Sequence, residues 1–339
     1  MKKSILSTIL SAALLLPASC VKDAQTPKND AAQRYFEAWI SYYYPDAQKT
    51  PLGAYILEDT PGTGLSSADS LYVRADYSYY DLDGNLIGTT RPRVAKQNGT
   101  FKSSNYYGPA FFYRGEELDN LPAGVEEAFA SMRVGGKRRV VIPGWLGEYS
   151  KRYDSEENYL LHCSGTDYIY ELELVSALDN TEKWEKDSLA RFISANCPEA
   201  VESESMPGFY YLTLRKGLED KTYTKDSTIY MNYTGRTLDG RVFDTTVADT
   251  AKVWNIYSSS KTYEPVLVNW DDDDYSGITI TSNKTSVISG FSYGISLLHP
   301  REKAQFFFYS GYGYSNSGSG STIPAFCPLI FEVDIVDEL

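Results

Sequence analysis

The side chains best suited to chemistry in this chain lie in one short stretch, NYTGRTLDGRVFDTT, from Asn232 to Thr246. It places Tyr233 ahead of an adjacent ring and carboxylate, Phe243 and Asp244. A phenol hydroxyl and a carboxylate beside an aromatic ring can orient a polar group at the edge of an apolar surface. A site built on these side chains would have mixed aromatic and polar character.

An earlier stretch, DYSYYDLDGNLIGTT from Asp76 to Thr90, aligns with this one without a gap. It keeps a tyrosine at Tyr77 but has Ile87 and Gly88 where the later copy has the ring and the carboxylate. The motif therefore occurs twice, and only the later copy has all the side chains of such a site.

Chemistry that depends on histidine, a metal ion or nucleic acid is not indicated. The two histidines, His162 and His299, fall in different halves of the chain, which disfavours a Ser-His-Asp triad and a His-rich metal site. A formal net charge of -13 disfavours binding to nucleic acid, which needs a concentrated basic face. We therefore expect no metal, no cofactor and no nucleic-acid partner.

The cysteines after Cys20 are few and widely spaced, and none forms a C-x-x-C pair: Cys163, Cys197 and Cys327. A zinc site is not predicted from this spacing. Whether the three are buried free thiols or include one disulfide remains open at this point.

The repetition extends along most of the chain and keeps the same order in both halves, which indicates a tandem duplication. With 339 residues, the chain is long enough for two domains that each bury a core. Four further pairs of segments match: Trp39–Ala47 with Phe192–Ala200, Gly53–Glu58 with Gly208–Thr213, Leu121–Ile142 with Val287–Phe308, and Tyr168–Val175 with Leu329–Val336.

Each copy predicts the same elements in the same order. A helix leads in, over 31–43 and 183–195, and alternating strands follow. One internal helix carries apolar residues at helical spacing, and closing strands come after it. Mostly antiparallel strands with one helix on a single face predict the α+β class, with a curved sheet wrapped around a short helix in each domain. We place the domains at 32–178 and 186–339.

The first twenty residues predict a secretory signal. Lys2 and Lys3 precede the apolar run ILSTILSAALLL, which is too short to span a bilayer permanently. The following PASC resembles a bacterial lipobox, which implies a signal peptide at 1–20, lipidation at Cys20, a polar tether at 21–31 and a lipid-anchored protein of the cell envelope. It would face either the periplasm or the cell surface. The alternative is an ordinary signal peptide with a chance cysteine.

Five motifs in the second half, YTGRTLDGRVFDTT, VISGF, YGY, TIP and LIFEVDI, occur in an order that resembles the FKBP-type peptidyl-prolyl cis-trans isomerases. The resemblance covers nearly all of 208–336 and, more faintly, 53–175. It implies an antiparallel sheet curled around a short helix, with an aromatic pocket between them. It also implies that proline-containing polypeptides are the substrates.

The resemblance assigns a role to each matching position. Tyr233, Asp244 and Tyr314 fall on the polar residues of the family's site, which we take as the catalytic group. Six apolar positions would line the substrate pocket: Phe243, Val287, Ile288, Phe291, Ile323 and Phe331.

This chain departs from the family pattern at three points. Phe291 replaces the usual tryptophan at the pocket floor, and Ser315 replaces a glycine. An insertion at about 247–286 leaves open whether Trp254 or the PVLV segment from Pro265 completes the aromatic wall.

The first copy matches the site poorly. Pro122 stands where the second copy has Ile288, Val125 where it has Phe291, and His162 where it has Ile323. We therefore expect 32–178 to be a degenerate FKBP-like domain that keeps the fold, whereas the better retained pocket belongs to 186–339.

Prolyl isomerisation suits an aromatic site because it needs neither a nucleophile nor a proton transfer. Rotation about the amide bond must cross a barrier of about 18–20 kcal/mol, and the enzyme must bind the twisted amide better than the planar one. An aromatic cleft does so by removing water from the carbonyl and packing the pyrrolidine ring. We therefore expect an isomerase that assists the folding of envelope proteins, with its activity in the second domain.

Alternatives remain for both the residues and the function. Phe243, Phe291 and Phe331 are also compatible with plain core positions, and Asp244 with a solvated turn. A non-catalytic lipoprotein that binds peptides or a partner is the main functional alternative, and a glycan-binding lipoprotein is another.

Overall fold

The computed structural model describes residues 29–68, 70–115, 121–149, 152–224, 227–270, 275–280 and 285–337. The predicted signal peptide, Cys20 and most of the predicted tether lie outside the described residues. Within these ranges, no helix has both the length and the apolar character needed to cross a membrane.

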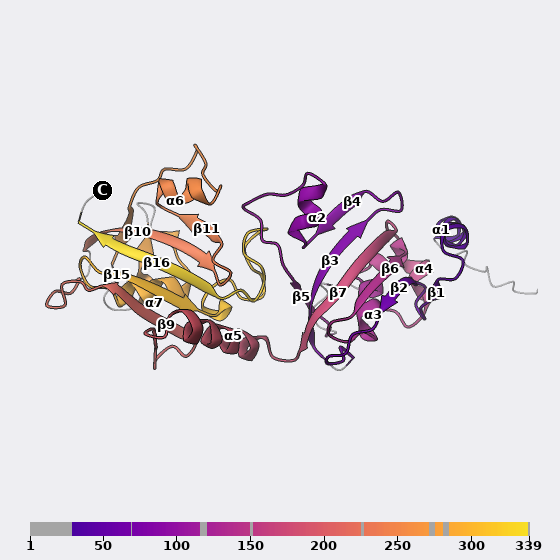
Figure 1. The fold of residues 1–339 in the computed structure, drawn as a ribbon, viewed down its shortest axis with the longest axis horizontal. Helices are drawn as coiled ribbons and strands as arrows, with labels where there is room; N and C mark the ends of the chain where they lie inside the picture. Colours follow the sequence, from indigo (N-terminus) through magenta and orange to yellow (C-terminus); the bar gives the residue numbers. More distant parts are fainter. Residues whose placement is uncertain are drawn as a thin grey trace, which may run out of the picture.

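The chain folds into two antiparallel sheets, one from each half of the sequence (Figure 1). The strands of the first are β1 (Gln48–Lys49), β2 (Tyr55–Thr60), β3 (Tyr72–Tyr80), β4 (Leu86–Thr89), β5 (Ala110–Tyr113), β6 (Lys137–Ile142) and β7 (Tyr168–Leu178). Their order is β1-β2-β6-β7-β3-β4, and β5 also pairs with β3.

The second sheet repeats this plan. Its strands are β8 (Val201–Glu202), β9 (Phe209–Arg215), β10 (Thr228–Thr237), β11 (Val242–Thr245), β12 (Val266–Asn269), β13 (Thr279–Ile280), β14 (Thr285–Ser286), β15 (Lys303–Phe308) and β16 (Leu329–Val336). The order is β14-β13-β12-β10-β16-β15-β9-β8, and β11 also pairs with β10. The central strands β3 and β10 thus occupy the same place in the two sheets.

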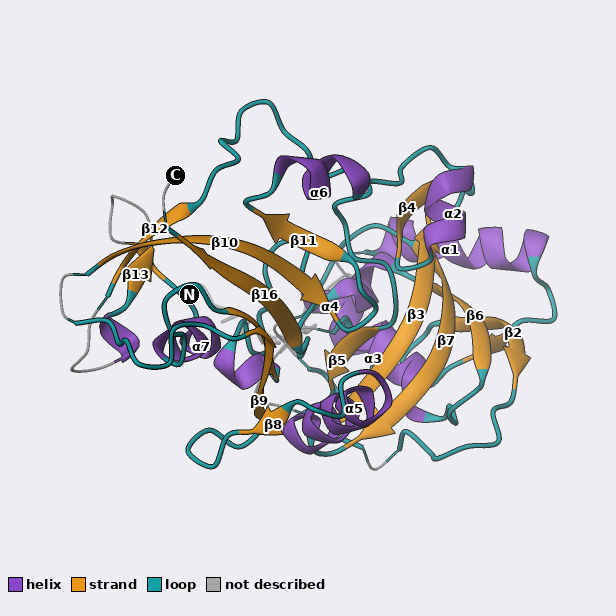
Figure 2. Ribbon diagram, turned by 60° about the vertical axis from the view of Figure 1, so that its left-hand side comes forward, coloured by secondary structure: helices purple, strands orange, loops and turns teal. Residues whose placement is uncertain are grey.

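Helices cover these sheets and connect them (Figure 2). The predicted α+β class, with curved antiparallel sheets and a short internal helix in each half, is confirmed. The helices are α1 (Asp30–Tyr43), α2 (Pro92–Gln97), α3 (Ala123–Ala130), α4 (Glu156–His162), α5 (Thr181–Asn196), α6 (Ala248–Val253) and α7 (Ser289–Ser296). Three short 3₁₀ turns are η1 (Gly144–Gly147), η2 (Tyr275–Gly277) and η3 (Ser310–Tyr312).

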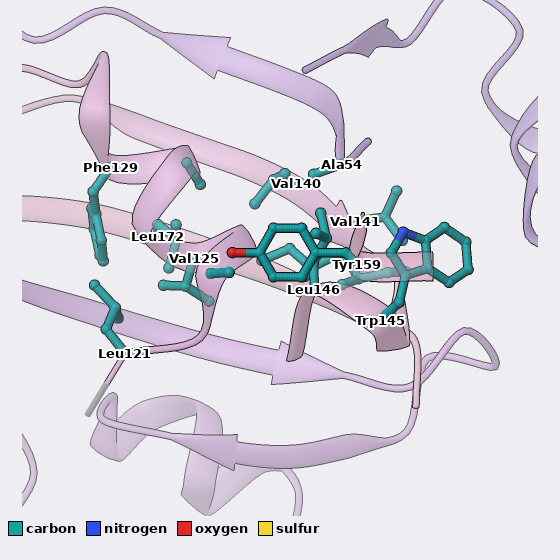
Figure 3. Close-up of a cluster of buried hydrophobic side chains, with 14 of the residues drawn as sticks. Ala54, Leu121, Val125, Phe129, Val140, Val141, Trp145, Leu146, Tyr159 and Leu172 are labelled. Atoms are coloured by element: carbon teal, nitrogen blue, oxygen red, sulfur yellow. The ribbon is translucent and has the colours of Figure 1, made fainter. Parts of the chain in front are cut away.

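Each half has its own core. In the first, Val125 and Phe129 of α3 pack against the sheet together with Trp145 and Tyr159 (Figure 3). In the second, α7 buries Phe291 on one face of the sheet. Buried apolar residues alternate with charged ones from Phe331 to Ile335 of β16, as period-2 patterning requires.

Helix α5 joins the two halves and belongs mainly to the second. It begins shortly after Leu178, the last residue of β7. The Asn180 side chain caps its N-terminus by accepting a hydrogen bond from the Lys183 N–H at 2.8 Å. Its Leu189 and Ile193 pack on the outer face of the second sheet, against residues of β15 and β16.

Aromatic side chains connect the two halves around Phe326. The Phe326 ring lies 5.6 Å from that of Tyr72 and 5.2 Å from that of Phe111, both in the first half. Phe111 also contacts Trp184 of α5, with the ring centroids 5.1 Å apart. The loop that carries Phe326 therefore rests on the first domain.

The insertion predicted at about 247–286 has two parts. The first, α6 with β12, has a counterpart in the first half, α2 with β5. The stacked pair Tyr257–Tyr263, 5.0 Å between centroids, matches the pair Phe101–Tyr107, 5.1 Å. The second part adds β13 and β14 to the edge of the second sheet.

Candidate functional site

The polar residues predicted for the site meet where β10 lies beside β11. The Tyr233 hydroxyl donates a hydrogen bond to Asp244 Oδ2 at 2.7 Å. Burial, reinforced by the adjacent carboxylate, raises the pKa of Tyr233, so the phenol stays protonated and acts as a donor. Asp244 Oδ1 accepts a hydrogen bond from the Thr245 N–H at 2.9 Å. The carboxylate is therefore held in a fixed orientation.

A group of buried rings forms the floor beneath this pair. Phe291 of α7 lies 4.4 Å from Phe331 of β16 and 5.6 Å from Tyr233, measured between ring centroids. Phe331 also contacts the Phe243 ring edge to face, at 5.6 Å and 82°. Phe291, Ile323 and Phe331 are 3%, 3% and 5% exposed, respectively, so they cannot themselves be a surface patch.

The remaining predicted residues form a half-buried rim around that floor: Tyr233, Phe243, Val287, Ile288 and Tyr314. Val287 and Ile288 lie just before α7, and Ile288 is the residue that precedes its first turn. Burial raises the pKa of Tyr314, and the nearby Asp244 carboxylate adds to the effect. The structure thus brings six of the nine predicted side chains together: Tyr233, Phe243, Asp244, Phe291, Tyr314 and Phe331. Val287, Ile288 and Ile323 belong to the same core. The catalytic and binding roles of all nine stay predictions.

Gly235 is required for the position of one of these rings. It lies on β10 directly opposite Asp244, and a Cβ atom there would come within 2.5 Å of the Phe243 ring. The Phe243 ring thus lies over β10 at Gly235, the one residue of that strand without a side chain.

Replacing this glycine should displace the ring. We expect Gly235→Ala to lower the free energy of unfolding by about 1–3 kcal/mol, because the added methyl group overpacks the site. Urea denaturation measures the change. Gly147→Ala is the control, since a Cβ atom at Gly147 meets nothing within 4 Å. Equal stabilities for the two variants would show that Phe243 does not lie where the structure places it.

The insertion reaches the site through a lysine. Lys261 Nζ forms an ion pair with Asp244 Oδ1, and the two side chains are 37% and 41% exposed. An ion pair this exposed contributes little to stability, roughly 0–1 kcal/mol. Its position matters more, because Lys261 covers one of the two oxygens of the site carboxylate.

Neither segment considered for the remaining aromatic wall supplies it. The Trp254 ring lies beneath the Arg236 guanidinium, 5.6 Å away, and is 37% exposed. The PVLV segment becomes β12, where Val268 is part of the buried core.

The loop between β15 and β16 is held at two points by residues outside the predicted site. At its start, the buried carboxylate of Glu185 accepts hydrogen bonds from the Ser310 N–H and hydroxyl, each at 2.8 Å. Further on, the Tyr106 N–H of the first domain donates to the Ser321 carbonyl at 2.7 Å. The loop that supplies Tyr314 and Ile323 is therefore braced by α5 and by the first domain.

Sequence reasoning did not find Lys261, Glu185 or Gly235. For Gly235 a signal exists, because the duplication aligns it with Tyr79 and aligns the opposing Asp244 with Gly88. The structure shows that Tyr79 and Gly88 also face each other, on β3 and β4. A Cβ atom at Gly88 would come within 2.5 Å of the Tyr79 ring.

The two copies have therefore exchanged the strand that supplies the ring. In the second copy, Phe243 of β11 lies over Gly235 of β10. In the first, Tyr79 of β3 lies over Gly88 of β4. The alignment alone predicts that the first copy has lost its ring, because it compares position with position and misses this reciprocal change. The carboxylate is absent from the first copy, as the alignment indicates.

The fold and the site together define a domain in which a curved antiparallel sheet and a short helix enclose an aromatic floor with a Tyr–Asp pair at its rim. Residues 219–336 match a family model described as FKBP-type peptidyl-prolyl cis-trans isomerase. This part of the chain is therefore similar to that family.

Similar proteins carry the same description. A probable FKBP-type peptidyl-prolyl cis-trans isomerase FkpA of Neisseria meningitidis serogroup B is 26% identical over 154 residues, which are 45% of this chain and 46% of the relative. A probable FKBP-type isomerase of Haemophilus influenzae is 28% identical over 38% of this chain and 42% of the relative. The chain thus spans less than half the length of these curated relatives. The crystal structure of FkpA from Escherichia coli is 20% identical, with a TM-score of 0.32, over 46% of this chain and 58% of that one.

Proposed function

We propose that this protein is a peptidyl-prolyl cis-trans isomerase whose active site lies in the second domain. The observation that carries the proposal is the Tyr233–Asp244 hydrogen bond at the rim of the Phe291–Phe331 floor. The match of residues 219–336 to the isomerase family supports it.

The arrangement suits a mechanism of differential binding. A proline ring of the substrate would pack on the rings, and the adjoining carbonyl would lose water as it enters the half-buried rim. The polar pair at Tyr233 and Asp244 would face that carbonyl as the amide twists. A thousandfold acceleration needs only about 4 kcal/mol of preference for the twisted amide, which this small set of contacts can supply.

We further propose that the protein is held in the cell envelope by a lipid on Cys20 and assists the folding of envelope proteins there. The support is the PASC sequence after the apolar run. Incorporation of labelled palmitate by the wild-type chain but not by Cys20→Ser is the expected result. Equal labelling of both would exclude this anchor.

The isomerase proposal is tested by following cis-to-trans conversion of a Phe-Pro peptide in the presence of the full chain. We expect a rate above the uncatalysed reaction that grows with protein concentration and disappears after heat denaturation. A folded chain that binds the peptide but leaves its rate unchanged would make this a binding protein instead.

A further inference from the structure

The first domain contains a cavity of about 270 Å³ beside β3 and β7. Five tyrosines line it, together with several apolar residues: Tyr77, Tyr79, Tyr149, Tyr168 and Tyr170. Figure 3 shows three of the apolar residues, Leu121, Val125 and Leu172, at one end of the first core, away from Trp145. No charged side chain is among the described residues that line this cavity.

The duplication relates this cavity to the candidate site of the second domain. Val125 corresponds to Phe291, and Tyr170 corresponds to Phe331. In the second domain the rings of Phe291 and Phe331 lie 4.4 Å apart and fill the floor. Valine is smaller than phenylalanine, so the first domain keeps open space at the matching place.

The tyrosine rings are arranged as the walls of a site. Tyr79 stacks on Tyr170, with centroids 5.2 Å apart and an interplanar angle of 9°. Tyr168 meets Tyr79 edge to face, at 5.4 Å and 88°. Tyr79 of the first copy stands where the second copy has Gly235. Its ring therefore gives the first copy an aromatic wall that the second copy builds differently.

The hydroxyl groups of these tyrosines are available to a ligand. None of the five has a hydrogen-bond partner among the described residues. Burial raises the pKa of Tyr77 and Tyr79, so both remain neutral donors. These hydroxyls are accessible to water, and a ligand with acceptor groups could take the place of that water.

These features favour a segment of polypeptide as the ligand. The apolar interior and the lack of charge among the described lining residues fit an uncharged apolar side chain or a proline ring. The phenol hydroxyls fit the carbonyl oxygens on either side of it. Sugars and cations fit less well, because none of the lining residues that the structure describes has a carboxylate or amide side chain.

We infer that the first domain is a second polypeptide-binding site, which holds an apolar segment without isomerising it. Gly88 stands where the second domain has Asp244, so the polar pair of the proposed active site is missing. The inference rests on the proposed function in one respect: the first domain would bind the same class of ligand as the second, an unfolded polypeptide chain. Two sites on one protein would retain such a chain longer than either alone.

The test is calorimetric titration of the full chain with the capped peptide acetyl-Ala-Phe-Pro-Phe-amide. We expect two binding events in the wild type and one in Val125→Phe, in which the larger side chain fills the cavity. Phe243→Ala, titrated in parallel, should lose the other event. Because Val125 is buried, Tyr149→Ala at the half-exposed edge provides a milder variant, expected to weaken the first-domain event by about fivefold.

The outcomes separate the two proposals. A single wild-type event that survives in Val125→Phe and Tyr149→Ala but is lost in Phe243→Ala would overturn the inference and leave the isomerase site in place. A single event lost in Val125→Phe and retained in Phe243→Ala would support the first-domain site and count against the second.

Discussion

Removing the Glu185 carboxylate is expected to destabilise the second domain by about 2–4 kcal/mol. Glu185 is 1% exposed on α5, and its two oxygens hold the Ser310 N–H and hydroxyl. Glu185→Ala would leave that buried N–H without a partner and release the start of the loop that carries Tyr314. Urea denaturation at pH 6 measures the loss.

Glu182→Ala is the matched control, because Glu182 lies one turn earlier on the same helix, has a 57% exposed side chain and forms an ion pair with Lys186. Its effect should stay below about 1 kcal/mol. If the two substitutions cost the same, the hydrogen bonds to Ser310 do not anchor the loop.

Because Glu185 is buried, we also expect an unusual pH dependence of stability. Burial raises its pKa from 4.5 to about 7, although the bonds from Ser310 oppose the shift. The folded state therefore binds this proton more tightly than the unfolded state. The resulting stabilisation is complete below about pH 4.5 and is lost as the pH rises through about 7.

Glu185→Gln tests that sign, because glutamine keeps hydrogen-bonding capacity and cannot ionise. We expect the wild type to lose stability relative to Glu185→Gln between pH 5 and pH 8, by up to about 3 kcal/mol. Thermal denaturation of both proteins at both pH values gives the comparison. A gap that does not change with pH would mean that Glu185 ionises in the folded state with an ordinary pKa.

Loss of the Asp244 carboxylate should have the largest effect on activity. Asp244→Ala removes the acceptor of the Tyr233 hydroxyl and the partner of Lys261, while the ring floor stays in place. We expect kcat/KM for a Phe-Pro peptide to fall by about 10–100-fold, which corresponds to roughly 1.4–2.7 kcal/mol in the transition state. The peptide isomerisation assay measures it.

Tyr233→Phe refines this prediction, because it keeps the ring contact with Phe291 and removes only the hydroxyl. Its loss should be smaller than that of Asp244→Ala. Asp249→Ala provides the control, since the Asp249 side chain on α6 is 89% exposed. An Asp244→Ala enzyme as active as Asp249→Ala would assign the catalytic polar group to another residue.

Much of the fold could be predicted because it depends on patterns that are local in the sequence. Alternating apolar residues and turn pairs such as Asp239–Gly240 mark the strands, and helical spacing marks α3 and α7. The ungapped duplication then orders these elements twice. The sequence leaves open whether two of the later cysteines form a disulfide. In the structure, Cys163, Cys197 and Cys327 are all free thiols.

The parts of the site that were missed depend on pairs of distant residues. Glu185 lies on the connecting helix, far in sequence from the Ser310 that it holds. Lys261 belongs to the insertion, for which the family resemblance offers no guide. The exchange between Tyr79 and Phe243 is visible only when the two strands of each hairpin are considered together. Such pairings follow from three-dimensional packing and leave no signal at a single position.

The central claim is that the second copy, and not the first, carries the isomerase site. The most direct measurement compares kcat/KM of the full chain after Phe243→Ala and after Ile87→Ala, its exposed counterpart in the first copy. We predict that Phe243→Ala loses about tenfold or more, because the ring beside Phe331 is gone, whereas Ile87→Ala keeps wild-type activity. Full activity in Phe243→Ala, or an equal loss in both variants, would contradict the account.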